Sequence, residues 1–148
     1  MHVLLATDHA GYAHKEVLKT WLTEQGHTVT DYGAFALDPA DDYPDFIIPA
    51  VTQLQTQPEA RAVILGGSGQ GEAMVANKLP GARAVVYYGG DIEILKLSRE
   101  HNDANVLSLG ARFISSEEAI RALEIWLSTP FSADERHIRR LKKLPHVS

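Results

Sequence analysis

The residues whose types and spacing could do chemistry begin with LGGSGQGE at positions 65–72, directly after a short apolar run. A glycine-rich turn from a buried strand into a helix exposes backbone N–H groups at the positive end of the helix dipole, which favours an anion. The motif lacks the Gly-Lys pair of a P-loop. Neither Gly67 nor Gly69 starts a G-x-G-x-x-G fingerprint, because Glu72 or Met74 stands where the third glycine would be. The loop therefore suits an anion other than a nucleotide's phosphates.

Such a loop can also hold a short-lived oxyanion, such as the enediolate that forms when a base removes a proton beside a carbonyl group. Glu72 falls in the first turn of the following helix and could be that base, while Ser68 could hydrogen-bond the carbonyl and hydroxyl oxygens. Acidic residues also favour the first turn of a helix as capping groups. The spacing alone leaves base and cap as two equal interpretations of Glu72.

Other polar residues could complete a site around this loop. Asp8 and His9 follow an apolar run and could bind sugar hydroxyls or cap the next helix. His101 could be a general acid–base, since histidine titrates near neutrality, or an ordinary surface histidine. Tyr43 could touch a substrate or simply begin a helix. The histidines and carboxylates show no H-x-x-x-H spacing, so no metal site is expected.

Arginines could supply the positive charge that a phosphorylated ligand needs. Arg136, Arg139 and Arg140 share one face of a late helix, because they are spaced i, i+3 and i+4. Such a cluster is most often a solvated surface. Arg112 follows another apolar run, and together these side chains could make bidentate contacts with a phosphate dianion. The arginines therefore predict either a solvated face or a phosphate clamp.

Composition excludes several classes of protein. The chain has 148 residues, 45% of them apolar, a net charge of −5 and no cysteine. The acidic balance argues against a nucleic-acid partner, and the missing cysteines exclude disulfides, thiolate metal sites and a cysteine nucleophile. Asp8 and His9 interrupt the short apolar start, and no run approaches the ~20 residues that span a membrane. We expect a soluble cytoplasmic protein without a membrane partner.

Strand-like and helix-like segments alternate along the chain. Strands are expected at 2–7, 27–32, 61–65, 83–88 and 105–109, and helices at roughly 11–25, 43–56, 71–78, 91–100, 116–128 and from about 132. Four strand runs are continuously apolar, as in strands buried on both faces of a parallel sheet, whereas 27–32 alternates and suits an edge. Ser116 precedes two glutamates and is expected to cap its helix. The alternation predicts an open α/β sheet with ligands beyond the carboxyl ends of its strands.

These clusters together closely resemble the ribose-5-phosphate isomerase B family, which includes the galactose-6-phosphate and allose-6-phosphate isomerases. The matching segments are TDHAGYAHK (7–15), DDYPDF (41–46), GGSGQGEAMVANKLPGARA (66–84), SREHNDANVLSLGAR (98–112) and ERHIRRL (135–141). Each segment alone would be a weak match. Together they follow the family's order and cover nearly the whole chain.

The resemblance implies a Rossmann-like three-layer αβα sandwich with a five-stranded parallel sheet, formed by residues 1–148 as a single domain. It implies a homodimer or homotetramer with active sites shared between subunits, and the helix from about 132 would pack on or reach the partner. No metal or organic cofactor is used in that family. The implied reaction interconverts ribose 5-phosphate and ribulose 5-phosphate by proton transfer through a cis-enediolate.

The resemblance also implies roles for individual residues. Asp8 would bind sugar hydroxyls, His9 would help to hold the phosphate, and His101, from the partner subunit, would assist ring opening. Tyr43 would contact the substrate. The hole around the enediolate would be formed by Gly67, Ser68, Gly69, Gly71 and Asn102. The phosphate would be clamped by Arg112, Arg136 and Arg140.

One position divides the family. Many members carry a cysteine base where this chain has Gly66, and a second branch has GGSGxGE and uses the glutamate instead. This chain has no cysteine and matches the second branch, so the resemblance makes Glu72 the expected base. Partial burial would raise the pKa of Glu72 toward working pH, whereas the helix N-terminus and nearby arginines would lower it. The sequence leaves that balance open.

One segment departs from the glutamate branch. Between PGAR and REHN the chain reads AVVYYGGDIEILKLS, which is slightly longer than in that branch and puts a new loop at 87–91 beside the expected site. The substrate could therefore be erythrulose 4-phosphate, allose 6-phosphate or galactose 6-phosphate. A flavodoxin-like module that binds a flavin phosphate is a different interpretation of the glycine loop, against which Glu72 argues. A third interpretation is a family member that has lost its activity and acts as a sugar-phosphate sensor.

Overall fold

The computed structural model describes residues 1–144, and the last four residues of the predicted domain lie outside the described part. The strands are β1 His2–Thr7, β2 Thr28–Asp31, β3 Arg61–Gly66, β4 Ala84–Tyr87 and β5 Val106–Gly110. The helices are α1 Tyr12–Glu24, α2 Pro44–Thr52, α3 Gln70–Ala76, α4 Glu93–Asn102, α5 Ser116–Ser128 and α6 Glu135–Leu141, with short 3₁₀ turns at His9–Gly11 and Gln53–Gln55. Each strand and helix expected from the sequence is confirmed.

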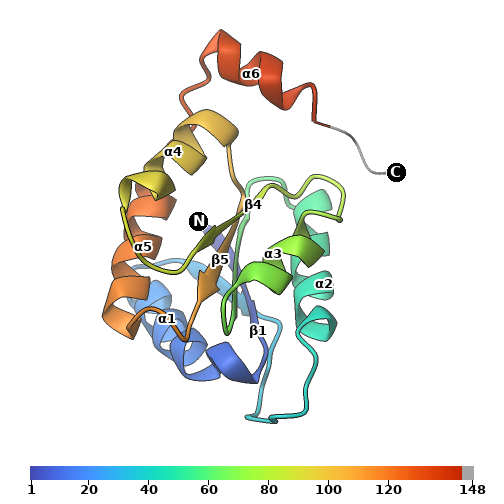
Figure 1. The fold of residues 1–148 in the computed structure, drawn as a ribbon, viewed down its shortest axis with the longest axis vertical. Coiled ribbons are helices and arrows are strands. Elements are labelled where there is room, and N and C mark those ends of the chain that lie inside the picture. The colour runs from blue at the N-terminus through green and yellow to red at the C-terminus, as the bar shows by residue number, and fades with distance from the viewer. Residues whose placement is uncertain (145–148) are drawn as a thin grey trace.

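The strands form one parallel sheet in the order β2-β1-β3-β5-β4. Helices α1, α4 and α5 cover one face, and α2 and α3 cover the other (Figure 1). The predicted three-layer αβα sandwich is confirmed. Because all strands run the same way, the loops after β1, β3 and β5 meet at one end of the sheet.

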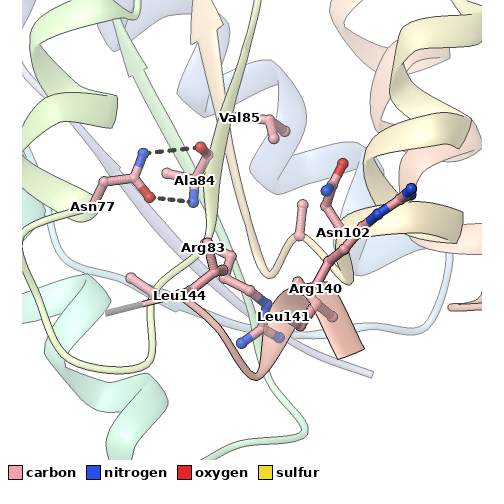
Figure 2. A pocket seen from close by; sticks show the side chains of 10 residues that line it. Asn77, Arg83, Ala84, Val85, Asn102, Arg140, Leu141 and Leu144 are labelled. Atoms are coloured by element: carbon pink, nitrogen blue, oxygen red, sulfur yellow. Dashed lines mark hydrogen bonds between the residues drawn. The ribbon is translucent and has the colours of Figure 1, made fainter. Parts of the chain in front are cut away.

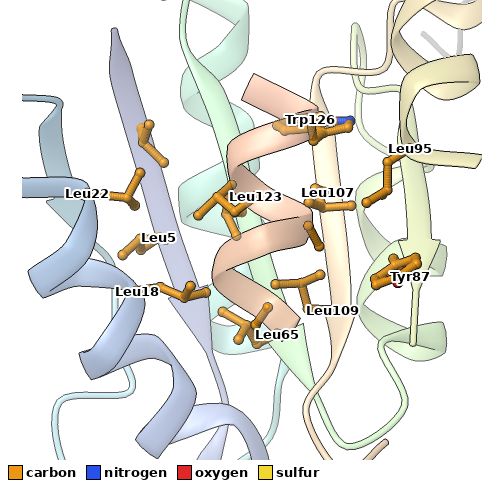
Figure 3. Close-up of a cluster of buried hydrophobic side chains, with 14 of the residues drawn as sticks. Leu5, Leu18, Leu22, Leu65, Tyr87, Leu95, Leu107, Leu109, Leu123 and Trp126 are labelled. Atoms are coloured by element: carbon orange, nitrogen blue, oxygen red, sulfur yellow. The ribbon is translucent and has the colours of Figure 1, made fainter. Parts of the chain in front are cut away.

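Successive residues of the central strands point to opposite faces of the sheet and pack into two parts of the core, one against α1, α4 and α5 and one against α2 and α3. Val3 and Leu5 of β1 face α1 and α5, whereas Leu4 packs with α2, because side chains alternate across a strand. Figure 3 shows the part of the core that packs against α1, α4 and α5, in which Trp126 of α5 is completely buried. Within residues 1–144, no helix is long and apolar enough to cross a membrane.

The two edges of the sheet differ from one another. β2 is an edge strand, as its alternating pattern predicted. The prediction that β4 is buried on both faces is wrong, because β4 forms the opposite edge, and Ala84, Val85 and Val86 are only half-buried. The continuous apolar run of β4 therefore leaves apolar surface uncovered at this edge of a single chain.

A buried ion pair fixes the chain where β2 ends. Lys15 of α1 is fully buried, and its Nζ lies 2.7 Å from both carboxylate oxygens of Asp31. Just beyond, the backbone of Gly33 and Ala34 exchanges hydrogen bonds with Thr7, at 2.8 and 2.7 Å. These contacts extend the β1 pairing past the strand ends and bring the segment that follows β2 over the carboxyl end of β1.

The N-cap of α5 differs from the prediction by one residue. Ser115, not Ser116, has extended backbone angles, and its Oγ accepts a hydrogen bond from the N–H of Glu118 at 3.1 Å. A cap precedes the first helical residue and bonds the N–H three positions ahead, so the two glutamates of the first turn fit either serine in the sequence. The backbone angles decide the register.

We predict that Ser115→Ala destabilises the fold by about 1 kcal/mol, because it removes the acceptor for one unpaired helical N–H. The melting temperature should fall by about 2–4 °C in a chain of this size. Ser116→Ala is the matched control and should change it by much less, since Ser116 already lies inside the helix. Equal shifts in the two variants would contradict this assignment of the cap.

Candidate active site

The candidate active site lies at the carboxyl ends of β1, β3 and β5, the three central strands of the sheet (Figure 1). Asp8 follows β1, the glycine loop follows β3, and Arg112 follows β5. Gly66 at the end of β3 pairs with Gly110 at the end of β5. The loops that carry these residues therefore meet where the sequence predicted a site, because the carboxyl ends of neighbouring parallel strands lie at the same edge of the sheet.

The glycine loop has one conformation set by its neighbours. Gly69 is the N-cap residue that precedes α3, and its φ of +77° is a backbone conformation that glycine adopts without strain. Ser108 of β5 donates a hydrogen bond to the carbonyl of Gly69 at 2.6 Å. Among residues 1–144, no acceptor takes the backbone N–H of Gly67, Ser68 or Gly69. These N–H groups are available to an anion.

Glu72 lies folded back against the start of its own loop. Its side chain is buried, with 3% of the residue exposed. A Cβ atom on Gly66 would lie 1.8 Å from Oε1 of Glu72 and 2.1 Å from its Cδ, far inside contact distance. The carboxylate therefore occupies the volume that a side chain at position 66 would need. A cysteine at 66 and a glutamate in this position exclude one another sterically.

The surroundings of Glu72 raise the pKa of its carboxyl group. Burial is the largest cause, and the negative charge of Asp8 adds to it, while a hydrogen bond from the backbone N–H of Glu72 itself acts in the opposite direction. The balance that the sequence left open thus favours burial. A carboxylate with a raised pKa is a stronger base than an exposed one, as proton abstraction beside a carbonyl requires.

Asp8 caps a short turn and keeps one carboxylate oxygen free of that contact. One oxygen, Oδ1, accepts a hydrogen bond from the N–H of Ala10 at 2.9 Å and caps the short turn that follows β1. The other oxygen, Oδ2, lies 4.0 Å from Nδ1 of His9. Capping therefore uses only part of the carboxylate, and the binding of sugar hydroxyls stays a prediction.

His9 has a partner that sequence reasoning missed. Oδ1 of Asp41 lies 2.6 Å from Nδ1 of His9 and also accepts a hydrogen bond from the His9 backbone N–H at 3.1 Å. This hydrogen bond is the largest cause that raises the pKa of His9, against the opposing effects of burial and of Arg112. Asp41 was visible only as an acidic residue near Tyr43, because the two residues it joins are 32 positions apart.

Arg112 and Tyr43 pack directly on the glycine loop. A Cβ on Gly67 would lie 3.2 Å from Nη1 of Arg112, so the guanidinium lies against the loop backbone. A Cβ on Gly71 would lie 2.7 Å from the hydroxyl of Tyr43. Two of the loop glycines therefore allow these side chains to approach closely. Their contact with a substrate stays a prediction.

A cation could find three ligand atoms in this region. Asp8, His9 and Asp41 each offer one, and within the described residues these atoms lie within 4.8 Å of one another. Nδ1 of His9 is hydrogen-bonded to Asp41, so a metal ion would have to displace that proton. The expectation of metal-free chemistry stays a prediction, which a chelator tests.

The remaining predicted residues lie at the opposite end of the sheet. His101 and Asn102 end α4, just before β5 begins, and α6 carries Arg136 and Arg140 beyond them (Figure 1). The rings of His101 and His137 are in edge contact, with centroids 4.2 Å apart, so α6 packs on α4 of its own chain. The five residues of β5 alone span about 17 Å. One chain cannot bring these four residues to the glycine loop.

A groove of about 360 Å³ opens at this opposite end (Figure 2). Asn102 and Arg140 line it together with apolar side chains that include Val85 of the β4 edge and Leu144. Two hydrogen bonds between the Asn77 side chain and the backbone of Ala84, at 3.0 and 2.8 Å, hold the end of α3 against β4. Predicted substrate-binding residues thus lie beside the uncovered edge of the sheet.

Comparison with known proteins gives a consistent result. A family model described as Ribose/Galactose Isomerase matches residues 3–144. The ribose-5-phosphate isomerase B of Mycolicibacterium paratuberculosis is 40% identical over 141 residues, which is 95% of this chain and 87% of the relative. That of Mycobacterium tuberculosis is 40% identical over 95% of this chain and 86% of its own length. A solved structure of the Mycoplasma genitalium protein with bound ribulose-5-phosphate has a TM-score of 0.91 at 30% identity, covering 97% of this chain and 93% of that one.

We predict that Glu72→Gln is at least as stable as the wild type at pH 7. A carboxyl group whose pKa is raised by folding binds its proton more tightly when folded, so stability falls as pH rises from the ordinary glutamate pKa through the raised one. The amide removes that penalty. The melting temperature of the variant relative to wild type should therefore increase between pH 4 and pH 7, as measured by calorimetry. If Glu72 were instead a charged helix cap, the variant would lose stability over the same interval.

Proposed function

The chain belongs to the ribose/galactose isomerase family, and we propose that this sugar-phosphate isomerase interconverts ribose 5-phosphate and ribulose 5-phosphate through a cis-enediolate. One observation carries the mechanistic part of the proposal. A buried carboxylate, with a pKa raised by that burial, lies beside three backbone N–H groups that have no acceptor among residues 1–144. A base and an oxyanion hole in one place are the two groups that enolisation needs.

In the proposed reaction, Glu72 removes the proton from C2 of the open-chain aldose. The C–H electron pair forms the C1–C2 double bond, and the carbonyl oxygen on C1 becomes an oxyanion held by the N–H groups of Gly67, Ser68 and Gly69. The protonated Glu72 then gives a proton to C1, while the proton of the C2 hydroxyl passes to the C1 oxyanion, so that C1 carries the new hydroxyl and C2 becomes the ketone. One base serves both carbons because the cis arrangement keeps them on the same face.

The phosphate would lie on the other side of the glycine loop, toward the cations. Arg112 lies on Gly67, and its charge acts on His9, which places two positively charged groups on this side of the site. Guanidinium and imidazolium N–H groups both donate strong hydrogen bonds to phosphate oxygens. Asp8, between Glu72 and His9, would hold the sugar hydroxyls that lie between the two ends of the substrate.

We further propose that the complete site needs a second copy of the chain in a homodimer. His101, Asn102, Arg136 and Arg140 lie at the far end of their own sheet, beside the half-buried edge strand β4. An antiparallel arrangement of two β4 edges would bring this end of one chain to the glycine loop of the other. His101 could then assist ring opening, Asn102 could extend the oxyanion hole, and the two arginines could complete the phosphate clamp. Metal independence and a cytoplasmic location belong to the same proposal.

The loop at 87–91, where the chain departs from the glutamate branch, borders the proposed site. Tyr88 is half exposed and stands over Gly110, where a Cβ would lie 2.8 Å from Cβ of Tyr88 and 2.7 Å from the carbonyl oxygen of Ser68. Tyr88 also contacts the exposed ring of Phe113 edge-on, at 6.0 Å between centroids. This aromatic pair is the feature that could change the preferred sugar to a four- or six-carbon phosphate. Membership of an isomerase family leaves the flavodoxin-like module without support.

The first test is an isomerisation assay with erythrose 4-phosphate, ribose 5-phosphate, allose 6-phosphate and galactose 6-phosphate, each with and without a chelator. We expect ribose 5-phosphate to have the highest kcat/KM and the chelator to have no effect. A higher kcat/KM for another sugar would contradict the proposed substrate and leave the chemistry intact. Loss of activity with the chelator would contradict the metal-free mechanism and direct attention to Asp8, His9 and Asp41.

Replacing Arg112 with alanine should chiefly weaken substrate binding. Because a hydrogen-bonded charge pair contributes about 1.5–3 kcal/mol, KM should rise by roughly 10- to 100-fold while kcat changes little. Arg121→Ala is the control for the loss of an exposed arginine, because Arg121 of α5 lies beside Tyr87 and Asp91 and makes no contact with the glycine loop in the described residues. Steady-state kinetics of both variants give the comparison. An unchanged KM in Arg112→Ala would remove this residue from the phosphate clamp.

A further inference from the structure

We propose that Asp41 is a positioning residue, which holds the imidazole ring of His9 so that its Nε2 presents a fixed N–H donor to the substrate phosphate. The proposal rests on the proposed function for the identity of the bound anion. It stands on the geometry of one carboxylate oxygen, Oδ1, which lies within hydrogen-bond distance of both the backbone nitrogen and the ring Nδ1 of His9, at 3.1 and 2.6 Å.

The carboxylate decides which ring nitrogen carries a proton. An ionised carboxylate only accepts hydrogen bonds, so Nδ1 of His9 must be the donor in this contact. Nε2 is then the atom left to face a ligand. In a neutral ring it would present a lone pair, which repels a phosphate oxygen, whereas in the cation it presents an N–H group. Phosphate binding therefore requires the doubly protonated ring.

The charged groups that face His9 act in opposite directions. Asp41 and Asp8, whose Oδ2 lies 4.0 Å from Nδ1, favour the cation, and Arg112 disfavours it. The hydrogen bond from Asp41 is the largest of these influences on the His9 pKa. Without this hydrogen bond, the charge of Arg112 would lower the pKa of His9 and reduce the fraction of the ring that is protonated beside the proposed phosphate. Asp41 thus allows the imidazolium of His9 and the guanidinium of Arg112 to donate hydrogen bonds to one phosphate.

The burial of Asp41 supports a role beyond holding the loop. Its side chain is 9% exposed, and its second oxygen, Oδ2, is buried without a hydrogen-bond partner in the described residues. An unpaired buried carboxylate oxygen is costly, so a purely structural site would be better served by a neutral side chain. The ion pair with His9 gives a reason for the charge. The His9–Asp41 pair is neutral as a whole, so it contributes an oriented N–H donor to the phosphate. Arg112 supplies the net positive charge.

The test compares Asp41→Asn with Asp42→Asn, both assayed with a chelator present. The asparagine at position 41 can still accept the Nδ1 hydrogen bond, so the ring stays in place and only the charge is lost. Asp42 is exposed and makes no side-chain hydrogen bond within residues 1–144, which makes it a matched control. The NMR titration of the His9 ring in the free enzyme measures its pKa directly, and kinetics at pH 5.5 and pH 8 measure the consequence.

We expect the His9 pKa to fall in Asp41→Asn and to stay unchanged in Asp42→Asn. A fall of one unit lowers the cation fraction at pH 8 by up to about tenfold. The KM of Asp41→Asn relative to wild type should therefore rise by about 5- to 10-fold at pH 8 and by less than about twofold at pH 5.5, with kcat little changed. The substrate phosphate also titrates between these pH values, but it does so equally for both enzymes, so its effect cancels in the ratio of the variant KM to the wild-type KM.

An unchanged His9 pKa, or a KM ratio that is the same at both pH values, would overturn the proposal, since a merely structural role predicts no pH dependence of that ratio. If none of the sugar phosphates is turned over, the proposed function fails separately. In that case, the affinity for inorganic phosphate at the two pH values replaces KM, and it must show the same pH-dependent loss in Asp41→Asn for the role of Asp41 to stand.

Discussion

The site depends on one steric constraint, which is that the carboxylate of Glu72 fills the space above Gly66. A single methyl group at position 66 would overlap Oε1 of Glu72, so the absence of a side chain there permits the glutamate to fold back under the loop. That placement buries the carboxylate and raises its pKa. The resemblance distinguishes members with a cysteine at this position from those with the glutamate, and the structure gives a physical reason why one chain would not use both.

The charges around the loop divide the proposed site into two functional halves. Carboxylates of Glu72 and Asp8 lie where a proton would move and sugar hydroxyls would bind, and the negative charge of Asp8 raises the pKa of both Glu72 and His9. Arg112 and His9 lie where the phosphate would bind. This separation matters because a cation beside Glu72 would lower the pKa of the base. Asp8 stands between the halves and acts on both.

Much of this arrangement could be predicted from the sequence, because it follows from local patterns. Four apolar runs and one alternating segment predicted the strands, and the polar residues at the strand ends predicted Asp8, Glu72 and Arg112 as neighbours. Three features could not be predicted in this way. The contact of Asp41 with His9 joins residues distant in the chain, the edge position of β4 depends on strand order, and the N-cap of α5 depends on a register that two adjacent serines fit equally. The separation of His101 from the loop of its own chain was expected only from the resemblance, which assigned it to the partner subunit, since the spacing of a motif gives no indication of which end of a sheet it will occupy.

The most direct test of the account is the exchange of substrate hydrogen with solvent. Ribose 5-phosphate would be incubated with the wild-type enzyme and with Glu72→Gln in D₂O, and the recovered sugars would be analysed by NMR for deuterium at C1 and C2. The account predicts deuterium at these carbons with the wild type, and a rate of incorporation and turnover lower by about 10²- to 10⁴-fold in the variant. Because a proton held on Glu72 exchanges with solvent in part of the turnovers, rapid isomerisation by the wild type without any incorporation over many interconversions would indicate direct hydride transfer. Wild-type exchange by Glu72→Gln would show that another group is the base. Either result would contradict the account.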